Sequence, residues 1–310
     1  MKKMMTLVLA LALALSLAAC GGTGNNAAND TADNTANNTA NDTADNTAND
    51  AGNTANDTAD AGDSATGDYG DFADALIEPG KLIMVTNASF PPYEMTDDDN
   101  NVIGIDPDIA QVIAEKLGLE LVIDNIDFDA ALMAVQEGRA DVMLAGMSYS
   151  EERDVVMDFS DTYATGYQVI IVREDDDRIA GGNEDLMLVD TDGNVIEDVQ
   201  IGVQRGTTGE LYCQDAYGVD KVTSLDNGSV AVQALLNGQV DCVVIDIGPA
   251  EEYVEANPGL KIVEGAYTIE DYCVGVDEGN TALLEAVNKA LNEMIDDGTV
   301  DEIMNQYIGG

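Results

Sequence analysis

Arg153 is the residue of this sequence whose type and position best suit the binding of a carboxylate. The chain has 60 Asp and Glu against 12 Lys and Arg. Arg153 comes shortly after the apolar run ADVMLA and the turn Gly146-Met147-Ser148, where a strand is expected to end. A guanidinium can hold a carboxylate through two parallel hydrogen bonds, a geometry that lysine cannot reproduce. The alternative is an ordinary solvated surface charge.

A second candidate is the turn Gly206-Thr207-Thr208-Gly209, which lies between the apolar run VQIGV and an expected helix. Backbone N–H groups and hydroxyls at such a turn form a cradle for an anionic group. Taken alone, the same residues could simply cap the helix. If the turn and Arg153 lie close together, they supply two sets of donors that could hold one carboxylate from opposite sides.

The elements that would position these residues alternate between short strands and amphipathic helices from Gly80 onward. Two such series are separated by an acidic, irregular stretch at 174–198. Alternation of this kind predicts an α/β fold with two mostly parallel sheets, each covered by helices on both faces. The expected strands are 81–86, 119–124, 140–145, 199–203, 221–225, 240–245 and 272–276, and the expected helices are 106–117, 127–137, 207–217, 227–237, 249–257 and 281–306.

Ligands of open parallel sheets bind beyond the carboxyl ends of the strands, where loops lead into helices. Four distinctive segments of this chain are expected at such ends, and we therefore expect them to form one binding site. They are NASFPPY (87–93), GMS (146–148), QRGTTG (204–209) and Asp246.

The N-terminal 20 residues have the pattern of a secretory signal, with Lys2 and Lys3 before an apolar core and small residues before Cys20. The ending Leu-Ala-Ala-Cys resembles the bacterial lipobox, which implies that 1–19 is removed and that Cys20 is lipidated. The alternative is a plain signal peptide. Residues 20–77 include five Asn/Asp-Thr-Ala tetrads at 29–48, and with little apolar bulk they are expected to form a disordered tether.

Composition excludes several classes of function. The net charge of −48 argues against nucleic acid as a partner and against binding of an anionic lipid surface by charge. The absence of His, and of any Cys-x-x-Cys or other metal-ligand spacing, weakens hydrolase and metalloenzyme hypotheses, and we expect no metal and no cofactor. Cys213 and Cys242 could form a disulfide, which the sequence does not decide, whereas Cys273 is expected to be buried.

These motifs together resemble one known family over residues 78–310: the bacterial extracellular solute-binding proteins, family 3, of the polar amino-acid type. The resemblance lies in NASFPPYEM, VIGIDPDIAQVIAEKLGLEL, the block from FDAALM to FSDTY, IGVQRGTTGELY and GQVDCVVID. It implies the type II periplasmic-binding-protein fold, in which two lobes joined by a two-strand hinge close around the ligand. Lobe 1 would comprise 78–170 plus 272–310, and lobe 2 would comprise 171–271.

The resemblance also implies a role for individual residues. Arg153 would bind the α-carboxylate of an amino acid, and Asp246 would accept from its ammonium group while also being able to cap a helix. Phe90 and Phe128 would enclose the aliphatic part of the ligand, and Tyr93 is an additional candidate. Further contacts would come from Gly146, Ser148, Thr207 and Thr208.

Two positions bear on specificity. Asn87 stands where relatives that bind cationic amino acids resemble one another in carrying Asp, and Gln204 stands where glutamine-type members carry Lys. Neutral amides at both positions favour a small, polar, neutral amino acid.

The implied function is a monomeric, lipid-anchored receptor outside the cytoplasm that delivers its ligand to the permease of an ABC importer. Two alternatives remain open: a secreted enzyme on the same fold, such as a dehydratase acting on an amino-acid precursor, and a structural or adhesive surface protein.

Overall fold

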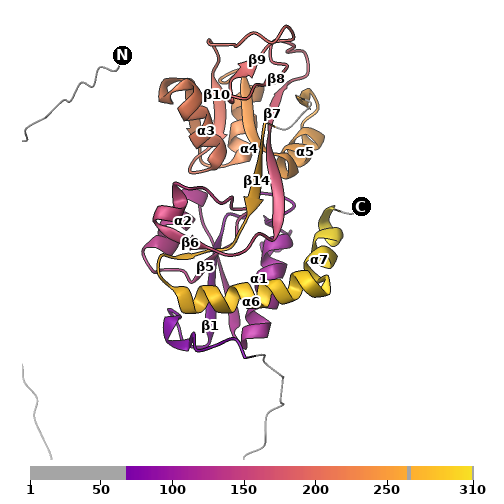
Figure 1. Cartoon of the computed structure of the whole chain (residues 1–310). Coiled ribbons are helices and arrows are strands. Elements are labelled where there is room, and N and C mark those ends of the chain that lie inside the picture. The colour runs from indigo at the N-terminus through magenta and orange to yellow at the C-terminus, as the bar shows by residue number, and fades with distance from the viewer. Residues whose placement is uncertain (1–67, 264–266, 309–310) are drawn as a thin grey trace, which may run out of the picture. The chain divides into compact units, whose positions relative to one another are not determined.

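The structure, a computed structural model, describes residues 68–263 and 267–308 (Figure 1). The expected signal segment, Cys20 and most of the expected tether lie outside these residues. The end of the expected tether, however, is folded. Tyr69 is buried in the first hydrophobic core, its hydroxyl donates to Glu293 Oε2 at 2.7 Å, and a short 3-10 helix, η1, spans Ala73–Ala75. The aromatic residues Tyr69 and Phe72 anchor this segment, so the tether would end before Tyr69 and not at residue 77.

The first sheet has the strand order β4-β1-β5-β15-β6. The three strands on one side of the sheet are parallel, namely β4 (Glu120–Asn125), β1 (Lys81–Thr86) and β5 (Val142–Met143). Strands β15 (Gly275–Asp277) and β6 (Met157–Phe159) are antiparallel to their neighbours. Side chains alternate between the two faces of β1. Leu82 and Met84 pack in the core with α1 (Ile105–Leu117) and α6 (Thr281–Asp297), whereas Ile83 and Val85 pack with α2 (Phe128–Gln136).

The second sheet has the order β11-β10-β12-β7-β13, and β14 also pairs with β7. Strands β10 (Ile201–Gln204), β11 (Val222–Leu225) and β12 (Cys242–Asp246) are parallel. Strands β7 (Ala164–Arg173), β13 (Leu260–Ile262) and β14 (Thr268–Tyr272) complete the sheet with antiparallel pairings. Each of the two expected sheets therefore contains three parallel strands, and antiparallel strands extend both sheets.

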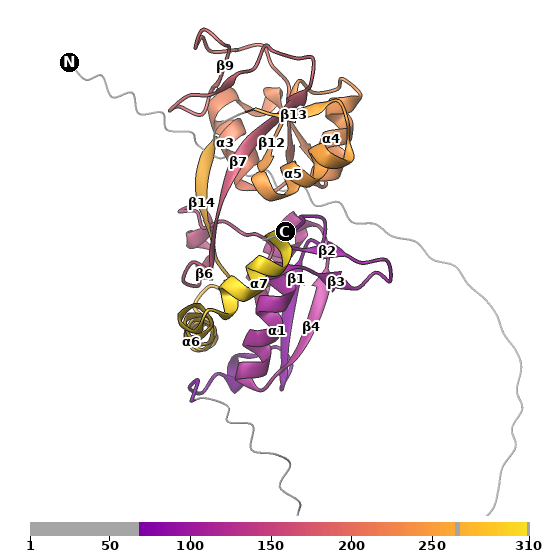
Figure 2. The ribbon, with the colours of Figure 1, turned by 90° about the vertical axis from the view of Figure 1, so that its right-hand side faces the viewer.

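Helices cover both faces of the second sheet, as Figure 2 shows. Cys242 and Val244 pack with Cys213 of α3 (Thr208–Tyr217). Val243 and Ile245, the alternate residues of the same strand, pack against α4 (Gly228–Leu236) and α5 (Ile247–Ala256). This alternation is what the apolar run at 240–245 predicts for a strand buried on both sides. We call each sheet with its helices a lobe.

The chain passes between the two sheets twice, between β6 and β7 and between β14 and β15. The two crossing strands β7 and β14 lie side by side in antiparallel register, from Gln168 opposite Thr268 to Ala164 opposite Tyr272 (Figures 1 and 2). The expected single strand at 272–276 is therefore divided between β14 and β15. Since β7 already belongs to the second sheet, we propose that the lobe boundaries fall near residues 163 and 273.

Several expected ends of elements differ from those found. Helix α1 begins at Ile105 with Gly104 as its N-cap, because the carboxylate of Asp106 is engaged elsewhere, as described below. Asn227, not Asp226, caps α4 by accepting from Val230 N–H at 3.0 Å. The left-handed backbone of Gly298 divides the expected helix 281–306 into α6 and α7 (Thr299–Ile308).

Two short antiparallel strand pairs lie outside the two sheets. The stretch 174–198 contains β8 (Gly181–Gly182) and β9 (Leu188–Val189). The segment 95–103 contains β2 (Met95–Thr96) and β3 (Val102–Ile103).

No helix within 68–263 and 267–308 has the length and apolar character needed to cross a membrane. Cys213, Cys242 and Cys273 are all buried and are not joined in disulfides. The sequence left open whether Cys213 and Cys242 form a disulfide. In the structure both are free thiols in the same apolar core.

Candidate ligand-binding site

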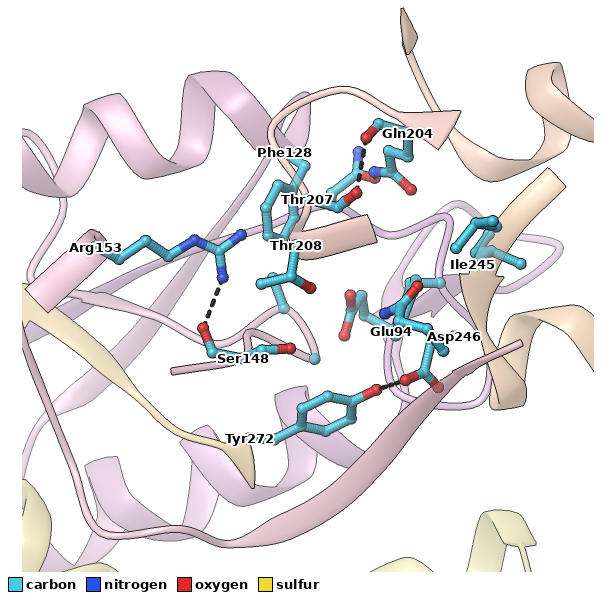
Figure 3. A pocket seen from close by; sticks show the side chains of 16 residues that line it. Glu94, Phe128, Ser148, Arg153, Gln204, Thr207, Thr208, Ile245, Asp246 and Tyr272 are labelled. Carbon is cyan, nitrogen blue, oxygen red and sulfur yellow. Dashed lines mark hydrogen bonds between the residues drawn. The ribbon is translucent and has the colours of Figure 1, made fainter. Parts of the chain in front are cut away.

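A pocket lies where the strand ends of the two sheets meet. It is formed by the segments that follow β1, β5, β10 and β12, together with the crossing strands β7 and β14 (Figure 3). Except for Tyr93, every residue expected in the site lines it: Asn87, Phe90, Phe128, Gly146, Ser148, Arg153, Gln204, Thr207, Thr208 and Asp246.

Arg153 lies at one end of this pocket, in the short 3-10 helix η2 (Arg153–Val155), and is only 6% exposed. Its Nη1 donates to the carbonyl oxygen of Ser148 at 2.6 Å, and its Nη2 donates to that of Gly206 at 2.9 Å. The guanidinium lies over the ring of Phe128, 5.5 Å from its centroid. Burial lowers the pKa of Arg153 to about 10, so the side chain is charged at neutral pH.

Arg153 forms no ion pair with any carboxylate of the described residues. A buried charge without a counterion is costly. The carbonyl oxygens of Ser148 and Gly206, and the more distant charge of Glu270, stabilise it in part. The side chain is thus suited to pair with a carboxylate that enters the pocket.

The turn before α3 faces Arg153 from the second lobe. Thr207 is the N-cap of α3, accepts from Glu210 N–H at 3.3 Å and donates to the carbonyl oxygen of Gln204 at 2.8 Å. Thr208 is the first residue of the helix and is 3% exposed. A helix N-terminus favours negative charge, so this turn and Arg153 present positive potential to the same end of the pocket.

Asn87 and Gln204 link the two lobes directly. Gln204 Nε2 donates to Asn87 Oδ1 at 3.0 Å, and the same oxygen accepts from Ser89 Oγ at 2.7 Å. Asn87 Nδ2 donates to the carbonyl oxygen of Ile126 at 2.9 Å. The amide of Asn87 is therefore held in one orientation at the edge of the pocket.

Asp246 lies at the other end of the pocket, and the helix-capping role expected for it is present. Its Oδ1 accepts from Gly248 N–H at 3.1 Å and so caps α5, while its Oδ2 accepts from the hydroxyl of Tyr272. Asp246 is 1% exposed, and burial raises its pKa to about 7. A cation placed beside it would favour the charged carboxylate.

Glu94 also lines the pocket close to Asp246, and the sequence interpretation did not single it out. It is 1% exposed, and no N–H or O–H group donates to either carboxyl oxygen in the described structure, although the carboxyl of Asp106 is close enough to share a proton with it. Burial, and then the nearby carboxylates of Asp106 and Asp246, raise its pKa well above the usual range. Its place directly after the expected loop 87–93 was a signal that could have included it.

Beneath Glu94, Asp106 supports the wall of the pocket. Its Oδ2 accepts from Gly146 N–H at 2.7 Å, and its Oδ1 accepts from the Tyr163 hydroxyl at 2.8 Å. Gly146 has a φ of +50°, and a Cβ there would lie 2.6 Å from Cε1 of Phe90. This glycine lets the Phe90 ring lie directly against the backbone.

Tyr93 is the expected site residue that does not line this pocket. It is 5% exposed and packs edge-on against Tyr272, with the ring centroids 5.0 Å apart. Tyr272 does line the pocket. The ring of Tyr93 is used as packing behind the site.

The crossing strands contribute three residues that the sequence interpretation missed. Gln168 of β7 lines the pocket, and its Nε2 donates to Glu270 Oε2 of β14 at 2.8 Å. Ser148 Oγ donates to the same Glu270 oxygen at 3.0 Å. Tyr272 ends β14. Their role depends on long-range pairing of β7 with β14, for which no local sequence signal was available.

Chemically, the pocket has positive potential at Arg153 and the start of α3, acidic groups at Asp246 and Glu94, and aromatic rings at Phe90 and Phe128. This arrangement suits a small zwitterion whose carboxylate and ammonium are separated by a few ångströms. Within 68–263 and 267–308, no cluster of His, Cys, Asp or Glu has the geometry to hold a metal ion.

Two α/β lobes with a ligand pocket between their strand ends define the periplasmic-binding-protein fold. The family model for bacterial extracellular solute-binding proteins, family 3, matches residues 82–310. The chain belongs to this family.

Curated relatives are amino-acid-binding proteins. The chain is 30% identical over 251 residues to a probable histidine-binding protein of Neisseria gonorrhoeae, covering 79% of this chain and 90% of the relative. It is 28% identical to ABC transporter arginine-binding protein 1 of Escherichia coli, covering 73% and 90%. It is 29% identical to the L-cystine-binding protein TcyJ of Escherichia coli, covering 75% and 84%.

The chain is also similar to solved structures of amino-acid-binding proteins. An ancestral arginine-binding protein bound to glutamine matches with a TM-score of 0.67 and 40% identity, covering 75% of this chain and 100% of the other. An ancestral arginine-binding protein bound to arginine matches with a TM-score of 0.65 and 41% identity, covering 74% and 98%.

Proposed function

We propose that this protein is the substrate-binding component of an ABC importer, that it captures a small, polar, neutral L-amino acid between its lobes, and that it delivers this ligand to a membrane permease. The observation that carries the proposal is the buried guanidinium of Arg153, which lacks an acidic partner among the described residues and faces a pocket with Asp246 at its other end.

The ligand would lie with its α-carboxylate at Arg153 and Thr208 and its ammonium at Asp246. Phe90 and Phe128 would enclose the carbon chain. Asn87 and Gln204, whose amides are hydrogen-bonded to each other, would present no net charge toward the side chain of the ligand. Since residues of both lobes contact one molecule, the ligand would favour the closed arrangement.

The test is a thermal-shift and calorimetric screen of the soluble domain against the twenty amino acids, cystine and several sugars. A ligand at 100 times its Kd stabilises the folded state by about 2.7 kcal/mol. A response to one or a few neutral polar amino acids supports the proposal. A response confined to cationic amino acids refutes neutrality, and a response to sugars alone refutes the amino-acid assignment.

We further propose that Cys20 carries the lipid anchor and that the following segment holds the lobes away from the membrane. Expression of the full chain and of its Cys20→Ala variant in a bacterial host with a labelled fatty acid tests this. The wild-type chain should take up label and fractionate with membranes, whereas the variant should take up none. Equal labelling of both chains would refute the anchor.

The enzyme alternative is supported by one observation, the raised pKa values of the two pocket carboxyls, Glu94 and Asp246, since such groups can act as acids or bases. The relatives compared above are binding proteins, which favours the receptor. Turnover of an amino-acid precursor by the wild-type protein, lost in Asp246→Asn, would favour the enzyme instead.

A further inference from the structure

Glu94 is the one pocket residue of the described structure whose buried carboxyl group receives no hydrogen bond from an N–H or O–H group at either oxygen, and its acidic neighbour Asp106 can only share a proton with it. A carboxylate in that situation is strongly destabilised, because it has lost its water and gained no donor. The carboxyl groups of the neighbouring acids Asp106 and Asp246, by contrast, accept hydrogen bonds from N–H and O–H groups. Asp106 accepts from Gly146 N–H and the Tyr163 hydroxyl, and Asp246 accepts from Gly248 N–H and the Tyr272 hydroxyl.

The buried groups near the pocket therefore carry an excess of acid. Glu94, Asp106, Asp246 and Glu270 are all at least nine-tenths buried, and Arg153 is the one basic residue that lines the pocket. Like charges this close cannot all ionise without a compensating cation. A proton shared by this cluster would reside mainly on Glu94, since Glu94 alone lacks donors to stabilise its charge.

The groups that face Glu94 come from every element packed around it, and none of them is basic. Two are acids and three are phenols, so nothing in this surrounding favours the ionised form of Glu94. They are Asp106 of α1, Asp246 at the end of β12, Tyr93 of the same loop, Tyr163 before β7 and Tyr253 of α5.

We propose that Glu94 determines which ligand charge the pocket accepts: holding its proton, it admits a neutral side chain, and losing its proton, it pairs with a cationic one. This inference rests on the proposed function and makes it more specific. A neutral amino acid brings no net charge and leaves the proton in place. An amino acid with a cationic side chain supplies the missing counterion, and its binding displaces the proton from Glu94 into solvent.

The experiment compares glutamine and arginine by titration calorimetry in buffers of different ionisation enthalpy, from pH 5.5 to 8. Arginine should release up to one proton, and its affinity should rise by as much as about tenfold per pH unit while Glu94 remains protonated. Glutamine should bind with much less proton release and a weaker dependence on pH. This comparison needs no variant, so it stays informative even if a substitution at position 94 impairs folding.

Glu94→Gln then removes the titrating group with almost no change in shape. It should weaken arginine binding at pH 8 by at least tenfold, and by more than it changes glutamine binding, and it should abolish most of the proton release. Glu285→Gln, the same substitution on the exposed surface of α6, is the matched control and should behave like wild type throughout.

Three results would overturn the inference. The first is binding of both amino acids with the same proton release, the second is arginine affinity unaffected by Glu94→Gln, and the third is no detectable binding of arginine at any pH while glutamine binds. Each of these leaves the proposed function intact, because an amino acid still binds. Failure of all twenty amino acids to bind the wild-type protein would instead overturn both proposals.

Discussion

Nη2 of Arg153, in the first lobe, donates a 2.9 Å hydrogen bond to the carbonyl oxygen of Gly206, in the turn that precedes α3 of the second lobe. The same guanidinium binds the carbonyl oxygen of Ser148 in its own lobe. The side chain is thus a direct connection across the pocket. Its remaining N–H groups are the donors that a ligand carboxylate would use.

Arg153→Ala should therefore weaken amino-acid binding by about 2 to 5 kcal/mol, because the carboxylate of the bound ligand would be left buried without its partner. Arg153→Lys should recover only part of this loss, since an ammonium cannot form the paired bonds. Calorimetry measures both, and Arg139→Ala, at an exposed arginine of the same lobe, is the control. A loss below about 1 kcal/mol in Arg153→Ala would exclude the residue from the site.

Asp246 should make the ligand-free protein less stable as the pH rises. Burial raises its pKa to about 7, so between about pH 4 and 7 the folded state holds a proton that the unfolded chain has released. The free energy of unfolding then falls across this window by up to about 4 kcal/mol on account of this group.

Urea unfolding of wild type and Asp246→Asn at pH 4.5 and 7.5 measures that contribution together with the smaller effect of the Asp246 charge on Glu94, and the variant removes both. The variant should lose less stability between the two pH values than the wild type does. Identical losses would mean that Asp246 ionises normally in the folded protein. The same variant should also weaken ligand binding, since it removes the acceptor for the ammonium.

Gly146→Ala should reduce both stability and ligand binding. The new Cβ would lie 2.6 Å from the Phe90 ring, and the backbone has a φ of +50°. We expect the backbone strain and the clash with Phe90 together to lower the free energy of unfolding by about 2 to 4 kcal/mol. Gly138→Ala is the matched control, because Gly138 also has a positive φ, +64°, but has no atom near its Cβ position.

Chemical denaturation of the two glycine variants separates the effects. Gly138→Ala should cost only the backbone strain of about 1 kcal/mol and leave ligand affinity unchanged. If both variants lost the same stability, the contact between Gly146 and Phe90 would have no energetic role.

Asn87→Asp should destabilise the ligand-free protein by about 1 to 3 kcal/mol, because Nδ2 of Asn87 donates to the Ile126 carbonyl oxygen and a carboxylate oxygen would face that carbonyl instead. It should also raise the affinity for cationic relative to neutral amino acids. Asn125→Asp is the control, since the side-chain oxygen of Asn125, which accepts from Ala88 N–H at 2.9 Å, is retained. Unchanged stability together with unchanged selectivity would remove Asn87 from the determinants of specificity.

Much of the fold follows from local patterns in the sequence. The apolar runs at 81–86 and 240–245 predict strands buried on both faces, and the structure confirms this in β1 and β12. Helix ends were harder to predict, because Asp106 and Asp226 both look like N-caps. The structure uses Asp106 to support Gly146 and uses Asn227 to cap α4.

For the site, residues at the ends of parallel strands could be identified because strand ends of one sheet necessarily share an edge. Arg153 and Asp246 are examples, and both line the pocket. Gln168 and Tyr272, which line the pocket, and Glu270, which accepts from Gln168, could not be identified in this way, because they lie within strands whose place at the pocket depends on the pairing of β7 with β14. Tyr93 shows the opposite limit: it belongs to a segment at a strand end, but its ring packs against Tyr272 and does not line the pocket.

The register of the two crossing strands has a consequence for how this protein could be altered. Ala164 lies opposite Tyr272, so the segment that forms the second lobe starts and finishes at neighbouring points. A segment with adjacent ends can be exchanged as a unit without moving the sheet it leaves or the helices that cover it. In topology, the second lobe is a continuous segment inserted into the first. Replacing that segment would change one half of the pocket, and so the ligand preference, while Arg153 and its surroundings stay in place.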